Sequence, residues 1–497
     1  MDQPFQKACS DQSVQYGMPL SMSQIDQMPP TPEGGKMWTT KGWLTPPIPN
    51  TGSDQKTSFQ SRIKTAHNPL LVWNLPHFTQ PYVIQTKQSG KAPLIEVALA
   101  HPEMIRHVLE NKAGRYGIFP GSMHCHDLNL SDGMAANQPL MQSMSQFSSQ
   151  ALNSFFATME TEASLLADKL SASPLEGEML IDPMIRDVIN RMIQSTLLTQ
   201  VPETKSRIVL SALDASLKTT GILDALKYLA LPNWLSGLGA RINQGPRTRL
   251  VEAVYALVAS RRAMPDAATQ SKTPDLISAL ISAFRVHPND NRHDEQITNM
   301  VIAILSTCYA TSHRTLVWAL AMLACAPDIQ QICANEARAI YADTAPLSGK
   351  IEDAHTIKAV INETLRLYPP VPVMRRTVLQ DDLNHDLAIT KGSTVLIAPW
   401  VLHRHSALWH DPHSFIPDRF LGDARRMIAP YTFLPFGGGE QTCIGFGYMM
   451  QATRLVLLAL LNQLSVQYPA RQSLPVPVQR VGLVPQSPIS LIFRCRA

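Results

Sequence analysis

The chain has 497 residues, of which 45% are apolar, so it is long enough to bury a large hydrophobic core. Its net charge is +4, charged residues make up 16% of the chain, and no block is rich in Lys or Arg, which argues against nucleic acid as a partner. No apolar stretch reaches the roughly 18 residues of a membrane span, and residues 1–60 contain neither a secretory signal nor any Arg. We therefore expect a cytoplasmic protein without a transmembrane anchor.

Seven cysteines are scattered along the chain. Their number is odd, and no two of them are spaced as Cys-x-x-Cys. Both facts argue against a disulfide framework and against a structural zinc site, and they favour a reducing compartment. Most of these cysteines are expected to be small buried side chains.

The first half of the chain begins with a distinct segment. Residues 1–60 hold eight prolines and show no apolar periodicity, which predicts a polar leader that is extended or disordered. Residues 61–497 are expected to form one domain. Within it, residues 92–112 predict a strand, a turn and a helix. Residues 140–260 are predicted to be mostly helical, with breaks at five prolines: Pro174, Pro183, Pro202, Pro232 and Pro246.

The second half is dominated by one long helical pattern. Residues 294–325 are too apolar for a solvated surface helix, so this helix is expected to run through the middle of the molecule. Helices are predicted at 328–342 and 353–367, the second one stopped by Tyr368-Pro369-Pro370. Residues 393–400 are β-like, and a final helix covers 444–464. The predicted fold class is mainly α with a minor β region.

The strongest chemical signal is the segment FLPFGGGEQTCIGFG, residues 433–447. Three glycines precede Cys443, Gly445 follows it, and a helical pattern begins at once. Glycines let the backbone turn tightly and approach a flat ligand, and a helix N-terminus stabilises a thiolate. A single thiolate suits haem iron, whereas zinc or an iron–sulfur cluster needs several cysteines. The alternative is a buried cysteine beside a Gly-rich turn.

Three motifs together resemble the cytochrome P450 superfamily, in its soluble bacterial type. The family's Phe-x-x-Gly-x-Arg/His-x-Cys-x-Gly loop matches at Phe436, Gly439, Cys443 and Gly445, its Glu-x-x-Arg helix at Glu363 and Arg366, and its Pro-x-Arg-Phe motif at Arg419. The resemblance implies the cytochrome P450 fold, with the long central helix over the haem. It also implies haem b as cofactor, with iron bound by the axial thiolate of Cys443.

Glu363 and Arg366 are three residues apart and so share one helix face. The resemblance implies that Arg419 joins them in a buried structural triad, which fixes the irregular stretch before the Cys443 loop. An ordinary surface salt bridge is the alternative for this pair.

The resemblance also places residues 307–312 on the oxygen side of the haem. Thr311 falls on the family's threonine and Ser312 follows it, and both are predicted to be catalytic. A helical threonine can turn its hydroxyl to the carbonyl four residues earlier, here Thr307, which opens a polar notch; the alternative is a threonine that only bonds its own backbone. Ala310 stands at the acidic position and Cys308 at the glycine position, so the usual acid–alcohol pair is half missing.

The expected anchors for the haem propionates also depart from the family pattern. Gln441 replaces the usual Arg or His of the loop, so it can donate a hydrogen bond without a charge. In the early helix, the Trp and Arg positions become Ala136 and Leu140. By the resemblance, Arg376 is the best remaining propionate anchor.

The leading hypothesis is a monooxygenase that inserts one oxygen atom from O2 into an apolar small molecule, with electrons from a ferredoxin- or flavodoxin-type donor. A second hypothesis is a haem-thiolate enzyme that uses peroxide or isomerises its substrate without an electron donor. A third is a non-catalytic haem-binding protein.

Overall fold

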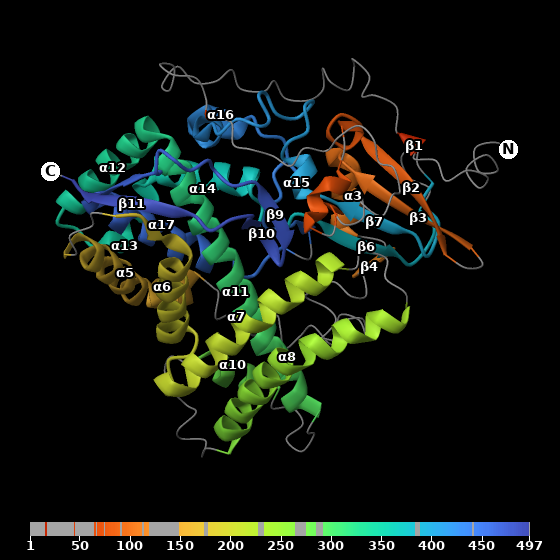
Figure 1. The fold of residues 1–497 in the computed structure, drawn as a ribbon, viewed down its shortest axis with the longest axis horizontal. Helices are drawn as coiled ribbons and strands as arrows, with labels where there is room; N and C mark the ends of the chain where they lie inside the picture. The colour runs from red at the N-terminus through yellow and green to blue at the C-terminus, as the bar shows by residue number, and fades with distance from the viewer. Residues whose placement is uncertain are drawn as a thin grey trace.

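The computed structural model describes residues 15–16, 44, 64–65, 67–73, 75–89, 92–111, 114–118, 149–172, 177–226, 233–263, 275–284, 292–382, 388–439 and 442–496. A large helical body lies beside a β-rich region (Figure 1). The predicted fold class, mainly α with a minor β part, is confirmed.

Helices make up most of the described residues. The α-helices are α3 (Pro102–Glu110), α5 (Ser149–Ala172), α6 (Ile181–Thr196), α7 (Glu203–Leu226), α8 (Asn233–Arg262), α10 (Leu276–Ala283), α11 (Arg292–Cys325), α12 (Pro327–Ala342), α13 (Leu347–Lys350), α14 (His355–Leu367), α15 (Pro399–Leu402), α16 (Gly422–Arg426) and α17 (Phe446–Gln463). Short 3-10 helices are η2 (Pro69–Val72), η3 (Leu75–Phe78), η7 (Ile351–Asp353) and η8 (Pro417–Phe420).

The strands form three sheets. The largest has the order β1 (Gln15–Tyr16), β2 (Tyr82–Ser89), β3 (Ala92–Leu99), β7 (Thr394–Ile397), β6 (Met374–Val378) and β4 (Tyr116–Ile118). Its pairs are antiparallel except β3 with β7. A second sheet joins β5 (Met179–Leu180), β11 (Ser490–Cys495) and β8 (Leu464–Gln467), and a third pairs β9 (Pro477–Arg480) with β10 (Gly482–Pro485).

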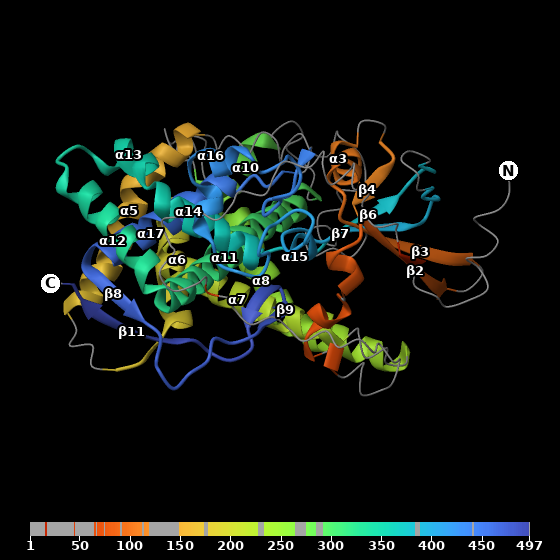
Figure 2. The same cartoon turned by 90° about the horizontal axis from the view of Figure 1, so that it is seen from above.

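The long helix α11 runs through the helical body (Figures 1 and 2). Residues 316–323 are all buried, which is typical of a helix packed on every side. Trp318 donates from Nε1 to the Leu483 carbonyl at 3.0 Å, and its ring stacks on Tyr368 with 3.9 Å between centroids. These contacts join the middle of α11 to β10 and to the end of α14.

The predicted elements of the second half lie close to those observed. Helix α11 begins two residues before the predicted start and ends at the predicted residue, and α14 ends at Leu367 before the Tyr-Pro-Pro turn. The β-like stretch 393–400 is shorter than predicted, because α15 already begins at Pro399. A proline at the first helical position is favourable, since its missing N–H would have no helical partner there.

Two prolines that were predicted to break helices lie inside them. Pro183 is the third residue of α6, within the first turn, where its missing N–H leaves no helical hydrogen bond unmade. Pro246 lies inside α8, where a proline costs about 3 kcal/mol or more. Helix α8 packs against α7 and α11, and its Val254 and Val258 are fully buried, which offsets the cost. Pro174 and Pro232 lie outside the described residues.

Among the described residues, no single helix is both long and apolar enough to cross a membrane. The pair α11 and α12 meets the same criterion only when taken together, and it is bent by 113° at its break. The predicted polar leader lies outside the described residues except for Gln15, Tyr16 and Leu44, so the predicted division at residues 60 and 61 stays a prediction.

Candidate functional site

The Cys443 loop, residues 436–445, is closed by its own backbone. Cys443 donates its N–H to the Phe436 carbonyl at 2.9 Å. Gly437 and Gly439 have positive φ angles of 72° and 65°, which glycine adopts at little cost. At Gly439 space is also lacking, because an added Cβ would lie 2.1 Å from the Leu109 carbonyl oxygen. The loop is therefore tightly turned and packed against the C-terminal end of α3.

The Cys443 thiol lies just before α17, whose N-terminal capping residue is Gly445. The backbone N–H groups of Gly445 and Phe446 donate to the sulfur. Burial raises the pKa of the Cys443 thiol, and these two hydrogen bonds oppose that effect by favouring the thiolate. The two backbone donors thus offset part of the cost that burial places on a negative charge at this sulfur.

Helix α11 faces this loop with Cys308. A methyl group built on Gly445 would lie 3.7 Å from the Cys308 sulfur and 3.9 Å from the Cys443 sulfur. Further along α11, Thr311 donates its hydroxyl to the Thr307 carbonyl at 2.7 Å, a bond that both the catalytic interpretation and its alternative predict, so the role of Thr311 stays a prediction. Ser312 is fully buried, and within the described part of the chain its hydroxyl has no hydrogen-bond partner.

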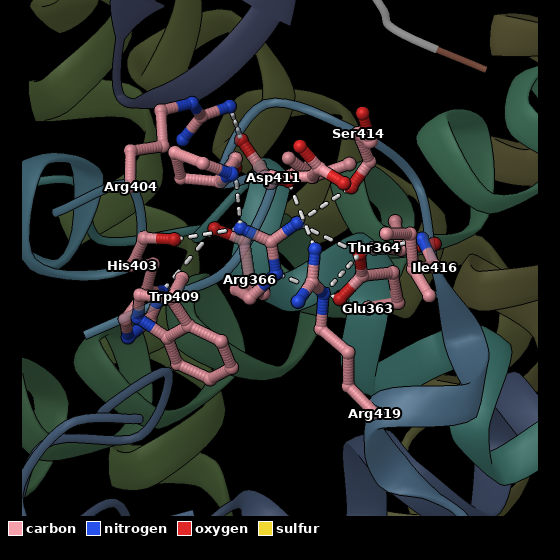
Figure 3. A network of polar contacts seen from close by, with 12 residues as sticks. Glu363, Thr364, Arg366, His403, Arg404, Trp409, Asp411, Ser414, Ile416 and Arg419 are labelled. Carbon is pink, nitrogen blue, oxygen red and sulfur yellow. Dashed lines mark hydrogen bonds and ion pairs between the residues drawn. The ribbon is translucent and has the colours of Figure 1, made fainter. Parts of the chain in front are cut away.

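Arg366 stands at the centre of a buried polar network between α14 and the segment that precedes the Cys443 loop (Figure 3). Its Nε and Nη2 each donate to the Glu363 carboxylate at 2.7 Å, and both side chains are 0% exposed. Its Nη1 donates to the backbone carbonyls of His403 at 2.7 Å and Pro412 at 2.6 Å. Its Nη2 also donates to the backbone carbonyl of Ser414 at 2.8 Å. The alternative of a surface salt bridge is wrong for this pair.

Glu363 has two further partners in the same network. Its Oε1 accepts the backbone N–H of Ile416 at 2.7 Å, and Arg419 Nε lies 3.5 Å from that oxygen. Arg419 also donates from Nη2 to the Asp411 carbonyl at 2.9 Å (Figure 3). The structure therefore brings Glu363, Arg366 and Arg419 together, and their partners are mostly backbone atoms of the irregular stretch.

His403 is a positioning residue that the sequence did not single out. Its Nε2 accepts the backbone N–H of Leu434 at 2.8 Å, and its Nδ1 lies 3.3 Å from the Arg366 carbonyl. Burial, with the charges of Arg366 and Arg404, holds the pKa of His403 well below its usual value, so the ring is neutral. The sequence feature that could have indicated a buried role for His403 is its position, because His403 and Arg404 come directly after the apolar residues 398–402.

The predicted propionate anchors are only partly described. Arg376 is half-buried in β6 opposite Ile118 of β4, and its Nη1 donates to the Arg375 carbonyl at 2.9 Å. Gln441, Ala136 and Leu140 lie outside the described residues. The roles predicted for Arg376 and Gln441 therefore stay predictions.

A family model of cytochrome P450 matches residues 93–493. The chain belongs to the cytochrome P450 family. The matched range includes the Cys443 loop, the network around Arg366 and the Thr311 turn, so the superfamily that the three motifs resembled is confirmed. Members of this family bind haem b through a cysteine thiolate.

Similar proteins include cytochrome P450 3A29 of Sus scrofa, 30% identical over 227 residues that cover 45% of each chain. Cytochrome P450 3A11 of Mus musculus is 33% identical over 200 residues, or 40% of each chain. This cytochrome P450 thus matches less than half the length of these relatives. The crystal structure of the cytochrome P450DA heme domain is similar with a TM-score of 0.70 and 19% identity over 92% of this chain and 98% of that one. At that identity the likeness shows the fold.

The described residues of this cytochrome P450 fit haem. Cys443 offers one sulfur supported by two backbone N–H donors, which is the donor set of a haem-thiolate iron. The Gly439 backbone makes a close approach that a side chain would prevent. In the described ranges, no group of three or more His, Cys, Asp and Glu is placed to hold another metal ion.

Proposed function

We propose that this chain is a haem-thiolate monooxygenase in which Cys443 is the axial iron ligand and one oxygen atom from O2 enters an apolar small molecule. The observation that carries the proposal is the Cys443 sulfur itself, which accepts two backbone hydrogen bonds at the start of α17. Family membership supports the type of reaction. The substrate, the product and the position attacked are not specified by these residues.

Haem, when bound, supplies the iron that activates dioxygen. The chain supplies the surroundings. The N–H groups of Gly445 and Phe446 stabilise negative charge on the Cys443 sulfur. The buried network of Glu363, Arg366 and Arg419 fixes the backbone that leads into the loop, so the sulfur is held in one place. We assign Phe436, Gly439 and Gly445 to the shape of the haem site.

The proposed oxygen side is α11. Thr311 donates its only hydroxyl proton to Thr307, so its oxygen is left as an acceptor that orients a water molecule or a substrate hydroxyl. We assign Ser312 a similar polar role, because its buried hydroxyl is unpaired within the described residues. Val301, Ile304 and Cys308 are three and four residues apart, so one apolar helix face leads to this point and suits an apolar substrate.

Electrons are proposed to come from a ferredoxin- or flavodoxin-type donor in the cytoplasm. The donor type, the cytoplasmic location and the soluble bacterial subtype remain predictions from the sequence. Arg376 and Gln441 are proposed to bind the haem propionates.

One observation favours a second candidate. Ala310 stands where the family has an acid, so the helix turn that carries Thr311 has no carboxylate for proton delivery. A haem-thiolate enzyme that uses peroxide, or that isomerises an oxidised substrate, has less need of that acid.

The first experiment tests the iron ligand. The carbon monoxide complex of the reduced protein should show the strongly red-shifted Soret band of thiolate ligation. Cys443→Ser should lose this band, whereas Cys308→Ser and Cys325→Ser should keep it. A band that survives in Cys443→Ser contradicts the assignment.

The second experiment separates the functions. NADPH-dependent turnover with a ferredoxin or flavodoxin system supports the monooxygenase. Turnover with peroxide alone, or isomerisation without reductant, supports the second candidate. Absence of turnover in both assays, with intact haem, favours a non-catalytic haem-binding protein.

A further inference from the structure

The last turn of α3 packs directly against the Cys443 loop. A methyl group built on Gly439 would lie 2.1 Å from the Leu109 carbonyl oxygen and 3.1 Å from the Glu110 nitrogen. A methyl group built on Gly438 would lie 3.4 Å from Leu109 Cδ1. Two successive glycines of the loop therefore rest on the end of this helix, and at Gly439 the contact is between two backbones.

Gly439 is connected in turn to the proposed iron ligand. Its carbonyl accepts the N–H of Thr442 at 3.3 Å and the hydroxyl of the same residue at 2.8 Å. Thr442 directly precedes Cys443, whose own N–H donates to the Phe436 carbonyl at 2.9 Å. The support that α3 gives to Gly439 therefore reaches Cys443 through two hydrogen bonds and one peptide unit.

A buried carboxylate, that of Asp382, holds the same turn of α3. Its Oδ2 lies 2.7 Å from His107 Nε2 and accepts the hydroxyl of Tyr116, and its Oδ1 accepts Arg115 Nη1 at 3.0 Å. The Asp382 side chain is only 3% exposed, so water and salt screen these charged contacts little. One carboxylate thus joins α3 to the start of β4.

The surroundings of Asp382 are fixed by further hydrogen bonds. Its backbone N–H and carbonyl pair with Ile389, at 2.8 Å in each direction. Asn111, the C-terminal capping residue of α3, pairs with Tyr116: its Nδ2 donates to the carbonyl at 2.8 Å and its Oδ1 accepts the N–H at 2.9 Å. Asp382 and Tyr116 therefore give the last turn of α3 a defined position.

Apolar packing also holds α3, but it defines the position of a helix less sharply. Ile105, Val108 and Leu109 are buried in a cluster with residues of the large sheet, beside which α3 lies (Figure 2). Apolar burial is not directional, whereas a hydrogen bond weakens steeply when its distance or angle changes. The exact position of the turn that supports Gly439 therefore depends on the bonds to Asp382.

We propose that Asp382 is a positioning residue for the iron ligand. It fixes the last turn of α3, this turn supports Gly439, and Gly439 holds Thr442 beside Cys443. Asp382 acts through α3, and its effect is on how firmly the thiolate is held at the iron. This inference rests on the proposed function, because it requires Cys443 to bind the haem iron.

The test uses purified haem-loaded proteins and two measurements. One is the rate at which haem passes to an excess of a haem-free globin. The other is the fraction of the reduced carbon monoxide complex that shows the red-shifted Soret band of thiolate ligation. Asp382→Asn keeps the size of the side chain and removes its charge. It should speed haem transfer about fivefold, the lower end of typical coupling between two sites, and lower the thiolate fraction.

Tyr116→Phe is a milder second variant, because it removes one donor to Asp382 and keeps the ring in the core. It should change both measurements in the same direction by a smaller factor, and it carries the test if Asp382→Asn does not fold. Unchanged haem transfer and an unchanged thiolate fraction in the folded variants would overturn the proposal.

Asp275→Asn is the matched control for general stability. Asp275 is also a buried carboxylate, paired with Arg261 at 2.9 Å, and it joins α8 to the start of α10. Its replacement should lower the thermal unfolding midpoint and leave both haem measurements at the values of the wild type. A speed-up as large as that of Asp382→Asn would mean that haem loss only follows stability, and it would also overturn the proposal.

A double-mutant cycle tests the route through α3. Leu109→Ala removes the side chain that touches Gly438, so it should itself speed haem transfer. Effects of independent, distant residues on the rate multiply, whereas residues of one connected path interact. The double variant of Asp382→Asn and Leu109→Ala should therefore transfer haem more slowly than the product of the two single effects.

A double variant whose effect equals that product would overturn the route through the last turn of α3. The proposed function fails in a different way. If the thiolate-type band survives in Cys443→Ser, the iron ligand itself is wrong, whatever the rates of the Asp382 variants.

Discussion

The backbone N–H of Leu434 donates to His403 Nε2 at 2.8 Å, and this hydrogen bond links the end of α15 to the segment that enters the Cys443 loop. The ring can accept this bond only when Nε2 carries no proton. His403 is also buried beside the guanidinium of Arg366. The position of the loop therefore depends on a histidine that must stay neutral.

Acidification should destabilise the protein through its buried histidines. Burial holds the pKa of His403 well below its usual value and lowers the pKa of His405 to about 4. In the unfolded chain both titrate near 6.5. As pH falls below that value, the unfolded chain binds protons that the folded chain does not. Each group should then lower the free energy of unfolding by up to about 1.4 kcal/mol per pH unit.

Thermal unfolding midpoints measured between pH 7 and pH 5 check this expectation. His405→Gln should reduce the dependence of the midpoint on pH, because glutamine does not titrate in this range. Its amide can still donate to the Gln80 carbonyl that His405 contacts at 3.1 Å, so the contact is kept. His410→Gln is the matched control, since its ring lies at the surface. A midpoint that is independent of pH in the wild type would count against buried neutral histidines.

Glu363→Gln should strongly destabilise the protein. It removes the carboxylate from Arg366, which is 0% exposed, and breaking a buried ion pair in this way costs about 3–5 kcal/mol. Urea unfolding measures the change. The control is Glu203→Gln on the exposed face of α7, where loss of the ion pair with Arg207 should cost less than about 0.5 kcal/mol. Equal effects of the two substitutions would contradict a structural role for the network.

Gly439→Ala should disrupt the Cys443 loop. The positive φ alone costs about 1–2 kcal/mol for alanine, and the added Cβ would also collide with the Leu109 carbonyl. We expect less haem per purified chain and a lower unfolding midpoint. Gly349→Ala is the control, because open space surrounds that position in α13. Full haem content in Gly439→Ala would show that the loop can relax.

Thr311→Ala should reduce the yield of product per NADPH several-fold if the protein is an oxygen-using monooxygenase. The variant loses the hydroxyl oxygen that is proposed to orient a water molecule on α11, so protons should reach the bound oxygen less efficiently. NADPH consumption, peroxide release and product are measured together. Ala310→Asp should improve coupling with substrates that lack a polar group. Full coupling in Thr311→Ala would show that protons arrive by another route.

The sequence by itself determined the long central helix, the end of α14 before Tyr368-Pro369-Pro370, and the motifs that carry the Cys443 loop and the Arg366 network. The helix and its neighbour's end depend on apolar spacing and on local turn chemistry, which neighbouring residues encode directly, whereas the two motifs were recognised by their resemblance to a family. Of the antiparallel pair β2 and β3, the sequence predicted strand β3 and did not predict strand β2.

Only the tertiary structure decided how distant segments meet. The bond between His403 and Leu434, the approach of Cys308 to Gly445, and the helical course through Pro246 all depend on packing between separate elements. Such contacts leave no periodic trace in the sequence, because each is set by the relative placement of whole helices. Packing energy also exceeds local preference at Pro246, where the burial of α8 against α7 and α11 offsets the cost of a proline inside a helix.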